Sequence, residues 1–306
     1  MRRLFENCSI GLRDVSPALG IPMVLAILAA ACARFLQRRL QPRRAAILLC
    51  FLAAGSAAAL FAALSIPAFA FLADVGALAG ISWCRDVLTG GHAPSPIVGA
   101  GASIFLGWGL FRGWQTVRRQ QLLRDLSFNE EVVVVPSDRV LAYAVPGRPG
   151  HVVVSAGMLD ALDDDEYTAL LAHERAHLDG GHHRFVLIGN VAAAAFPILR
   201  PLARQIEFST ERCADETAAA AVGDRSLVAR AIAAAAFASR DRAPSLGLVN
   251  LGVVGRVEAL LEDDASGKRW FEVVAGLGLL VVTVNLFSSL VELHHFIVLA
   301  AHICGL

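Results

Sequence analysis

The residues best suited to chemistry are His173, Glu174 and His177, which form an H-E-x-x-H pattern in the stretch His-Glu-Arg-Ala-His. On a helix, residues i and i+4 share a face, so both imidazoles can bind one ion. Glu174 is then placed to act on a water molecule rather than on the ion. Zinc lowers the pKa of a bound water towards neutrality, and a nearby carboxylate can take its proton. The pattern therefore predicts zinc-dependent hydrolysis, most often of a peptide bond. The alternative is a surface helix that carries two histidines.

A catalytic zinc needs a third protein ligand, and His183 is the nearest candidate. The string His-Glu-Arg-Ala-His-Leu-Asp-Gly-Gly-His-His fits the metzincin pattern H-E-x-x-H-x-x-G-x-x-H, with His183 as its last residue. Metzincins also need a methionine turn after the zinc site. All three methionines precede that site, at Met1, Met23 and Met158. The sequence therefore disfavours His183 as the ligand.

The second candidate is a carboxylate among Glu207, Glu211 and Asp215, which are spaced by four residues and share one helical face. The segment lies between an apolar run and an alanine-rich run, so this face is expected to be partly buried. Buried carboxylates need partners. Glu211 as ligand, with Asp215 accepting from a ligand imidazole, would meet that need. Spacing alone also allows Glu207 as ligand, or an acidic face in solvent.

The elements around the motif are predicted from local signals. Residues 131–137, 139–145 and 151–155 are rich in β-branched side chains and indicate a small sheet or hairpin, whose edge could hold an extended peptide. Asp163 and Glu166 form a predicted capping box that starts the motif helix, which is expected to break at Gly180-Gly181. Further helices are predicted over 202–222 and 225–239. The apolar stretch 185–199 is expected to be a buried helix or to dip into a bilayer.

Composition indicates a membrane protein with a polar domain. The 306 residues are 56% hydrophobic and 18% charged, against about 45–50% and about 25% in soluble domains. The mean hydropathy is +0.58. Net charge is zero, so a nucleic-acid partner is not expected. The predicted fold is mainly α, with about four transmembrane helices and an α+β domain that holds the small sheet.

Three apolar segments, at about 15–36, 45–66 and 93–111, are predicted to span the membrane within an N-terminal region of residues 1–111. Pro67 is expected to end or kink the second helix near Ile66. Residues 112–269 form the predicted zinc domain. A fourth span, roughly 271–291, lies in the C-terminal region 270–306.

Arginines define the predicted orientation. They are concentrated in the loop 37–44 and again at Arg112, Arg118, Arg119 and Arg124. By the positive-inside rule both stretches face the cytoplasm, which places the zinc domain there and the N-terminus outside. Cys8 and Cys84 then fall on the outer side, where a disulfide could join them.

The pattern His173-Glu174-x-x-His177, followed by Glu211-Arg-Cys-Ala-Asp215, resembles the gluzincin membrane peptidases of the HtpX-like and BlaR/MecR-like families. The run from Val152 to Glu174 also looks like the BlaR/MecR series of a strand, SxGLL, LxxxE and LxHExxH. This resemblance covers about residues 130–240. It implies zinc held by His173, His177 and Glu211, with Glu174 as the base and Asp215 as an orienting acid.

One departure from the BlaR/MecR pattern concerns their penicillin-binding sensor. Few residues follow the last predicted span, and the only lysine, Lys268, has Ala265 three positions before it, so the S-x-x-K motif cannot form. The resemblance thus implies a multi-pass zinc endopeptidase without that sensor, in a bacterial inner or plasma membrane. It would cleave a protein at the cytoplasmic face in regulatory proteolysis, and a transcriptional repressor is one candidate substrate.

Two other functions stay open. The same site would serve an HtpX-like quality-control protease. A non-catalytic zinc-binding sensor or scaffold is the third possibility, and Cys213 could then close a structural site. Hydrolysis would also need a donor to the developing oxyanion, for which the nearby candidates are His182, His183 and Arg212.

Overall fold

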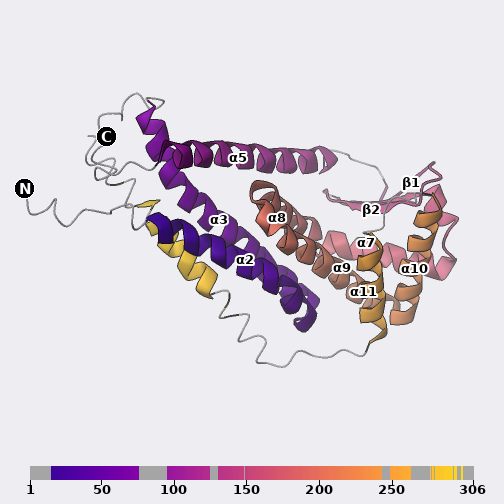
Figure 1. Ribbon diagram of the computed structural model, residues 1–306. Coiled ribbons are helices and arrows are strands. Elements are labelled where there is room, and N and C mark those ends of the chain that lie inside the picture. The colour runs from indigo at the N-terminus through magenta and orange to yellow at the C-terminus, as the bar shows by residue number, and fades with distance from the viewer. Residues whose placement is uncertain are drawn as a thin grey trace, which may run out of the picture.

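The computed structural model describes residues 15–75, 95–124, 130–147, 149–242 and 249–262, together with 276, 278, 280–291, 293–294 and 298. Figure 1 shows long helices on one side and, on the other, a small sheet with shorter helices around it. Cys8, Cys84 and Lys268 lie outside the described residues, and so does much of the fourth predicted span. The predicted disulfide therefore stays a prediction.

Three long helices come first among the described residues: α2 (Val15–Arg39), α3 (Pro42–Asp74) and α5 (Pro96–Arg124). Among the described residues, two helical segments, Gly20–Arg39 and Pro42–Ala73, are long and apolar enough to cross a membrane. They coincide with the first two predicted spans. The third predicted span lies in α5, which does not reach that hydropathy, and Leu280–Val291 of the fourth is a shorter apolar helix. Four spans are therefore not confirmed.

The second predicted helix does not end near Ile66, since α3 continues through Pro67 to Asp74. Proline removes one backbone donor and crowds the preceding turn, which is why an end was expected there. Tertiary packing maintains the helix instead. Gly99 of α5 lies against Pro67 and Phe71 so closely that an added Cβ would be 2.4 Å from Cβ of Phe71. Ser103 of α5 also donates to the carbonyl of Ala68 at 3.4 Å.

The predicted small sheet is confirmed, with three strands: β1 (Val132–Val135), β2 (Ala142–Val145) and β3 (His151–Ser155). Their order is β1-β3-β2, with β3 parallel to β1 and antiparallel to β2. Every residue of β3 is buried, as its central position requires. The edge strand β2 also packs against α7 (Asp164–Asp179), the helix that carries the motif.

Helix α7 begins as predicted, because Asp163 accepts from the backbone of Glu166 at 2.7 Å and the Glu166 side chain reaches back to Asp163. At Gly181 the backbone has φ 60°, a left-handed conformation that suits glycine, and α8 (His182–Ala195) follows. A short 3-10 turn, Pro197–Leu199, leads into α9 (Arg200–Val222). The chain continues with α10 (Arg225–Arg242) and α11 (Val249–Leu261).

Helix α9 joins the two halves of the molecule (Figure 1). Its first half buries Leu202 and Ile206 in one apolar core with Leu49 and Leu52 of α3. Its second half buries Ala218 and Ala219 with side chains of α7, α10 and α11. The residues between these two cores, around Glu211, therefore lie on a helix that is fixed at both ends.

Candidate metal centre

The structure brings His173, His177 and Glu211 together between α7 and α9. The Nε2 atoms of the two histidines lie 3.0 Å apart, as expected for residues one turn apart on a helix. Glu211 Oε1 lies 3.4 Å from Nε2 of His177, and Oε2 lies 3.6 Å from Nε2 of His173. One ligand atom from each residue falls within 4.8 Å of the other two, so the group could hold a metal ion.

The remaining ring nitrogens face other partners. His173 Nδ1 lies 3.0 Å from Asp215 Oδ1, although this short approach is outside hydrogen-bond geometry. His177 Nδ1 lies 3.1 Å from Nδ1 of His182. A carboxylate beside Nδ1 favours the tautomer with its proton there, which leaves the Nε2 lone pair of His173 free to bind a cation.

Arg256 of α11 reaches the same cluster and was not found by sequence reasoning. Its Nε and one terminal nitrogen bind the carboxylate of Asp215 at 2.8 and 2.6 Å. Its other terminal nitrogen lies 2.8 Å from Glu211 Oε2. No motif marks this residue, but Arg256 is the only basic residue in the mostly apolar α11, which indicates a charge with a buried partner.

These contacts shift the pKa values of the cluster. Burial opposes the charge on His173, but Asp215 and Glu211 outweigh it and raise the pKa of His173 to about 9. Burial lowers the pKa of His177 to about 3. For Glu211, burial opposes ionisation, yet His173 and Arg256 lower its pKa to about 2. The pKa of Asp215 is lowered in the same way, chiefly by Arg256 and His173. Ionised Glu211 and Asp215 are therefore favoured here.

Glu174 lies on the other side of the motif, against the sheet. Its side chain is buried, and burial raises the pKa of its carboxyl group, while the backbone N–H of Ala144 in β2 donates to it. The edge strand β2 therefore runs directly beside Glu174. A residue in an antiparallel strand directs its N–H and C=O to the same side, so both groups of Ala144 point away from β3.

The charges of the cluster fit a divalent cation. Three carboxylates, Glu174, Glu211 and Asp215, face the single guanidinium of Arg256. Ionised, these carboxylates outnumber the guanidinium, and a divalent ion bound to neutral imidazoles would supply positive charge to this acidic group. Two imidazoles and one carboxylate are also the donor set of some catalytic zinc sites, which keep a fourth position open. The residues present thus fit a catalytic metal better than a closed structural one.

The other predicted residues lie around this group rather than in it. His182 is buried against Nδ1 of His177, on the opposite side of that ring from Nε2. The backbone carbonyl of His183 accepts from Gln120 of α5 at 3.1 Å. Nε of Arg212 is buried, and within the described part of the chain it has no hydrogen-bond partner. Glu207 lines a separate cavity between α5, α8 and α9.

Comparisons with known proteins point to the same chemistry. A family model for Peptidase family M48 matches residues 115–189. A Protease HtpX homolog of Desulforapulum autotrophicum is 38% identical over 78 residues, which are 24% of this chain and 24% of that protein. A Protease HtpX homolog of Aquifex aeolicus is 38% identical over 65 residues, 21% of this chain and 20% of that protein. No solved structure gives a significant match.

These matches support an HtpX-like M48 metalloprotease, but the aligned part spans only about a quarter of the length of the curated relatives. The matched segment 115–189 includes α7 and the H-E-x-x-H residues. It stops before Glu211, Asp215 and Arg256. The assignment of Glu211 as a candidate ligand, with Asp215 and Arg256 as its partners, is therefore supported by the geometry of α9 and α11 and not by the family match. Neither relative is a BlaR/MecR protein, and that part of the resemblance stays a prediction.

Proposed function

We propose that this protein is a membrane-embedded, zinc-dependent endopeptidase that cleaves a protein substrate at the cytoplasmic face. The observation that carries the proposal is the convergence of His173, His177 and Glu211 from two helices, with Glu174 beside them. The match to Peptidase family M48 and the two apolar helices support it. The cytoplasmic face follows from the arginine-rich stretches that flank the apolar segments.

Each residue has a role in this proposal. His173, His177 and Glu211 would hold the zinc, which when bound polarises a scissile carbonyl and activates water. Glu174 takes the proton of the attacking water and returns it to the leaving amine. Asp215 and His182 orient the two imidazoles through their Nδ1 atoms, and Arg256 holds Glu211 and Asp215 in place.

Strand β2 is the proposed substrate edge. Ala144 directs its backbone towards Glu174, so an extended peptide paired with β2 would pass directly beside the proposed base. Tyr143 of the same strand is 46% exposed and available to contact a substrate side chain. Main-chain pairing gives affinity with little dependence on sequence, which suits cleavage of unfolded or extended segments.

The experiment compares full-length wild type with Glu174→Gln, measuring zinc content and hydrolysis of a fluorescently labelled unfolded casein. We expect about one zinc per chain in both proteins and loss of hydrolysis by on the order of a hundredfold or more in the variant. Asp165→Asn, an exposed change on the same helix, is the matched control. Zinc-free wild type, or undiminished hydrolysis by the variant, would refute the proposal.

The possible biological roles of this site predict different results in cells that carry Glu174→Gln. Regulatory cleavage, of a repressor for example, predicts that one protein accumulates in cells carrying Glu174→Gln. A quality-control protease predicts accumulation of many damaged membrane proteins. A non-catalytic scaffold predicts neither. The scaffold gains no support from Cys213, because the donor group found among the described residues consists of His173, His177 and Glu211 without it.

A further inference from the structure

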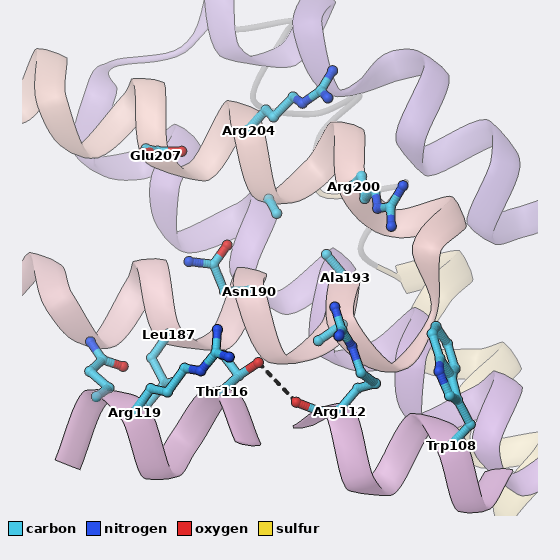
Figure 2. A pocket seen from close by; sticks show the side chains of 13 residues that line it. Trp108, Arg112, Thr116, Arg119, Leu187, Asn190, Ala193, Arg200, Arg204 and Glu207 are labelled. Atoms are coloured by element: carbon cyan, nitrogen blue, oxygen red, sulfur yellow. Dashed lines mark hydrogen bonds between the residues drawn. The ribbon is translucent and has the colours of Figure 1, made fainter. Parts of the chain in front are cut away.

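A charged cavity that none of the candidate metal ligands lines lies between α5, α8 and α9. It has a volume of about 510 Å³, opens to the surface, and is lined by α5, α8 and the start of α9. Four arginines line it: Arg112 and Arg119 from α5, and Arg200 and Arg204 from α9. Figure 2 shows them on the two outer helices, with Asn190 of α8 between, and Trp108 and Glu207 at opposite ends.

Among the described residues, no carboxylate pairs with these four guanidinium groups. Within the part of the chain that the structure describes, none of them forms a salt bridge with a carboxylate, and Arg112 lies only over the ring of Trp108, 5.9 Å from its centroid. Arginines along one edge of a single helix need no role beyond orienting the chain in a membrane. Here they come from two helices far apart in sequence and line one cavity, where like charges repel without a counter-ion.

The surface beside this cavity is apolar. Before Arg112, helix α5 exposes the large side chains of Ile104 and Phe111, at 73% and 54%. Ile198, just before Arg200, is also exposed. Trp108 stands where the apolar surface meets the arginines, the position that tryptophan favours at a membrane interface. The site is therefore amphipathic, with charge and hydrocarbon-like surface side by side.

We propose that this cavity binds the phosphate-bearing headgroup of an anionic phospholipid, with its acyl chains along the exposed surface of α5. Arginine forms paired, charge-assisted hydrogen bonds to phosphate oxygens, and basic pockets at the cytoplasmic ends of membrane helices suit such headgroups. A free phosphate shares this chemistry but would not use the apolar surface. Glu207 can accept hydrogen bonds from headgroup hydroxyls, as in phosphatidylglycerol. The proposal rests on the membrane location proposed above, but not on peptidase chemistry.

The test uses the full-length protein in a non-ionic detergent. Short-chain phosphatidylglycerol, phosphatidylcholine of the same chain length, and inorganic phosphate are titrated separately, and binding is followed by native mass spectrometry and thermal unfolding. We expect phosphatidylglycerol to bind at least about tenfold more tightly than either of the other two. Arg200→Gln combined with Arg204→Gln should weaken it by on the order of tenfold per guanidinium removed.

Arg118→Gln is the matched control, because Arg118 lies on α5 beside Arg119 but stacks on Trp114 outside the cavity. If the α9 double variant does not fold, Arg112→Gln combined with Arg119→Gln tests the opposite wall. Equal binding of inorganic phosphate or phosphatidylcholine would overturn the lipid assignment. Unchanged binding in the cavity variants, or an equal loss in Arg118→Gln, would overturn the site.

Discussion

Replacement of Arg256 by methionine is expected to destabilise the metal-free protein strongly. The Arg256 side chain is only 15% exposed. It makes two short hydrogen bonds to Asp215, whose side chain is 2% exposed, and one contact to Glu211 at 2.8 Å. Methionine keeps much of the volume and removes the charge. Asp215 and Glu211 would then share His173 as their main cationic partner, which leaves a buried negative charge uncompensated.

The magnitude follows from this geometry. Removing one partner of a buried ion pair costs about 3–5 kcal/mol, and Glu211 is 31% exposed, so the lower end applies. In a domain of this size, about 3 kcal/mol corresponds to a drop of roughly 6–12 °C in the unfolding midpoint. Most of this loss of stability should come from the buried carboxylates, which no longer have the guanidinium as a partner. Adding Asp215→Asn to Arg256→Met should therefore cost at least about 1 kcal/mol less than the sum of the single changes.

The assay is thermal unfolding of the full-length, chelator-treated protein in detergent, with wild type, both single variants and the double variant measured together. Arg230→Met, an exposed arginine on α10, controls for the loss of any surface charge and should change the midpoint by little. Additive effects in the double variant would refute the reasoning, and so would an Arg256→Met protein as stable as the Arg230→Met control.

Three further changes test other parts of the structure by the same unfolding assay. Zinc at about 100 times its dissociation constant should stabilise the stripped protein by about 2.7 kcal/mol, and Glu211→Gln should remove most of this gain. Asp163→Ala removes the cap of α7 and should cost about 1 kcal/mol. Gly109→Leu should cost about 1–3 kcal/mol, because a Cβ there would lie 3.1 Å from the carbonyl oxygen of Ala195, which is backbone and cannot turn aside.

Each change has a control. Magnesium in place of zinc should not stabilise the protein, since two imidazoles and one carboxylate suit zinc better. Asp163→Asn keeps a capping side chain and should retain most of the stability that Asp163→Ala loses. Gly107→Leu places the same side chain on the same helix where nothing lies within 4 Å. If Gly107→Leu destabilised the protein as much as Gly109→Leu, close packing of α5 on α8 would not be the cause.

Local signals predicted much of the fold, and non-local packing decided the rest. The capping box of Asp163 and Glu166 is a contact over three residues, so it can be read directly from the sequence. The strand segments were also visible, but nothing local places β3 between β1 and β2 or makes its pairing with β1 parallel. At Pro67 the local rule was wrong, because α5 packs against α3 there and the helix continues.

In the candidate site, too, local spacing predicted some residues and non-local packing decided the others. Glu211 and Asp215 could be predicted because the spacing of four residues places both on the face of α9 that meets α7. Arg256 could not, since it comes from a helix separated from them by the whole of α10. The arginine-lined cavity between α5, α8 and α9 could not be predicted either. Its arginines were visible in the sequence, but their convergence from α5 and α9 depends on how α8 packs between these helices.

The order of the helices along the chain has a consequence for biosynthesis. The ribosome releases α7 first, then α9, and only after the whole of α10 does Arg256 of α11 emerge. Until then Glu211 and Asp215 lack the guanidinium that neutralises them in the finished fold. A nascent chain can thus contain all three candidate ligands while the buried carboxylates still lack their cationic partner. The charge balance of the centre is therefore completed only when α11 has emerged, after both helices that carry the candidate ligands.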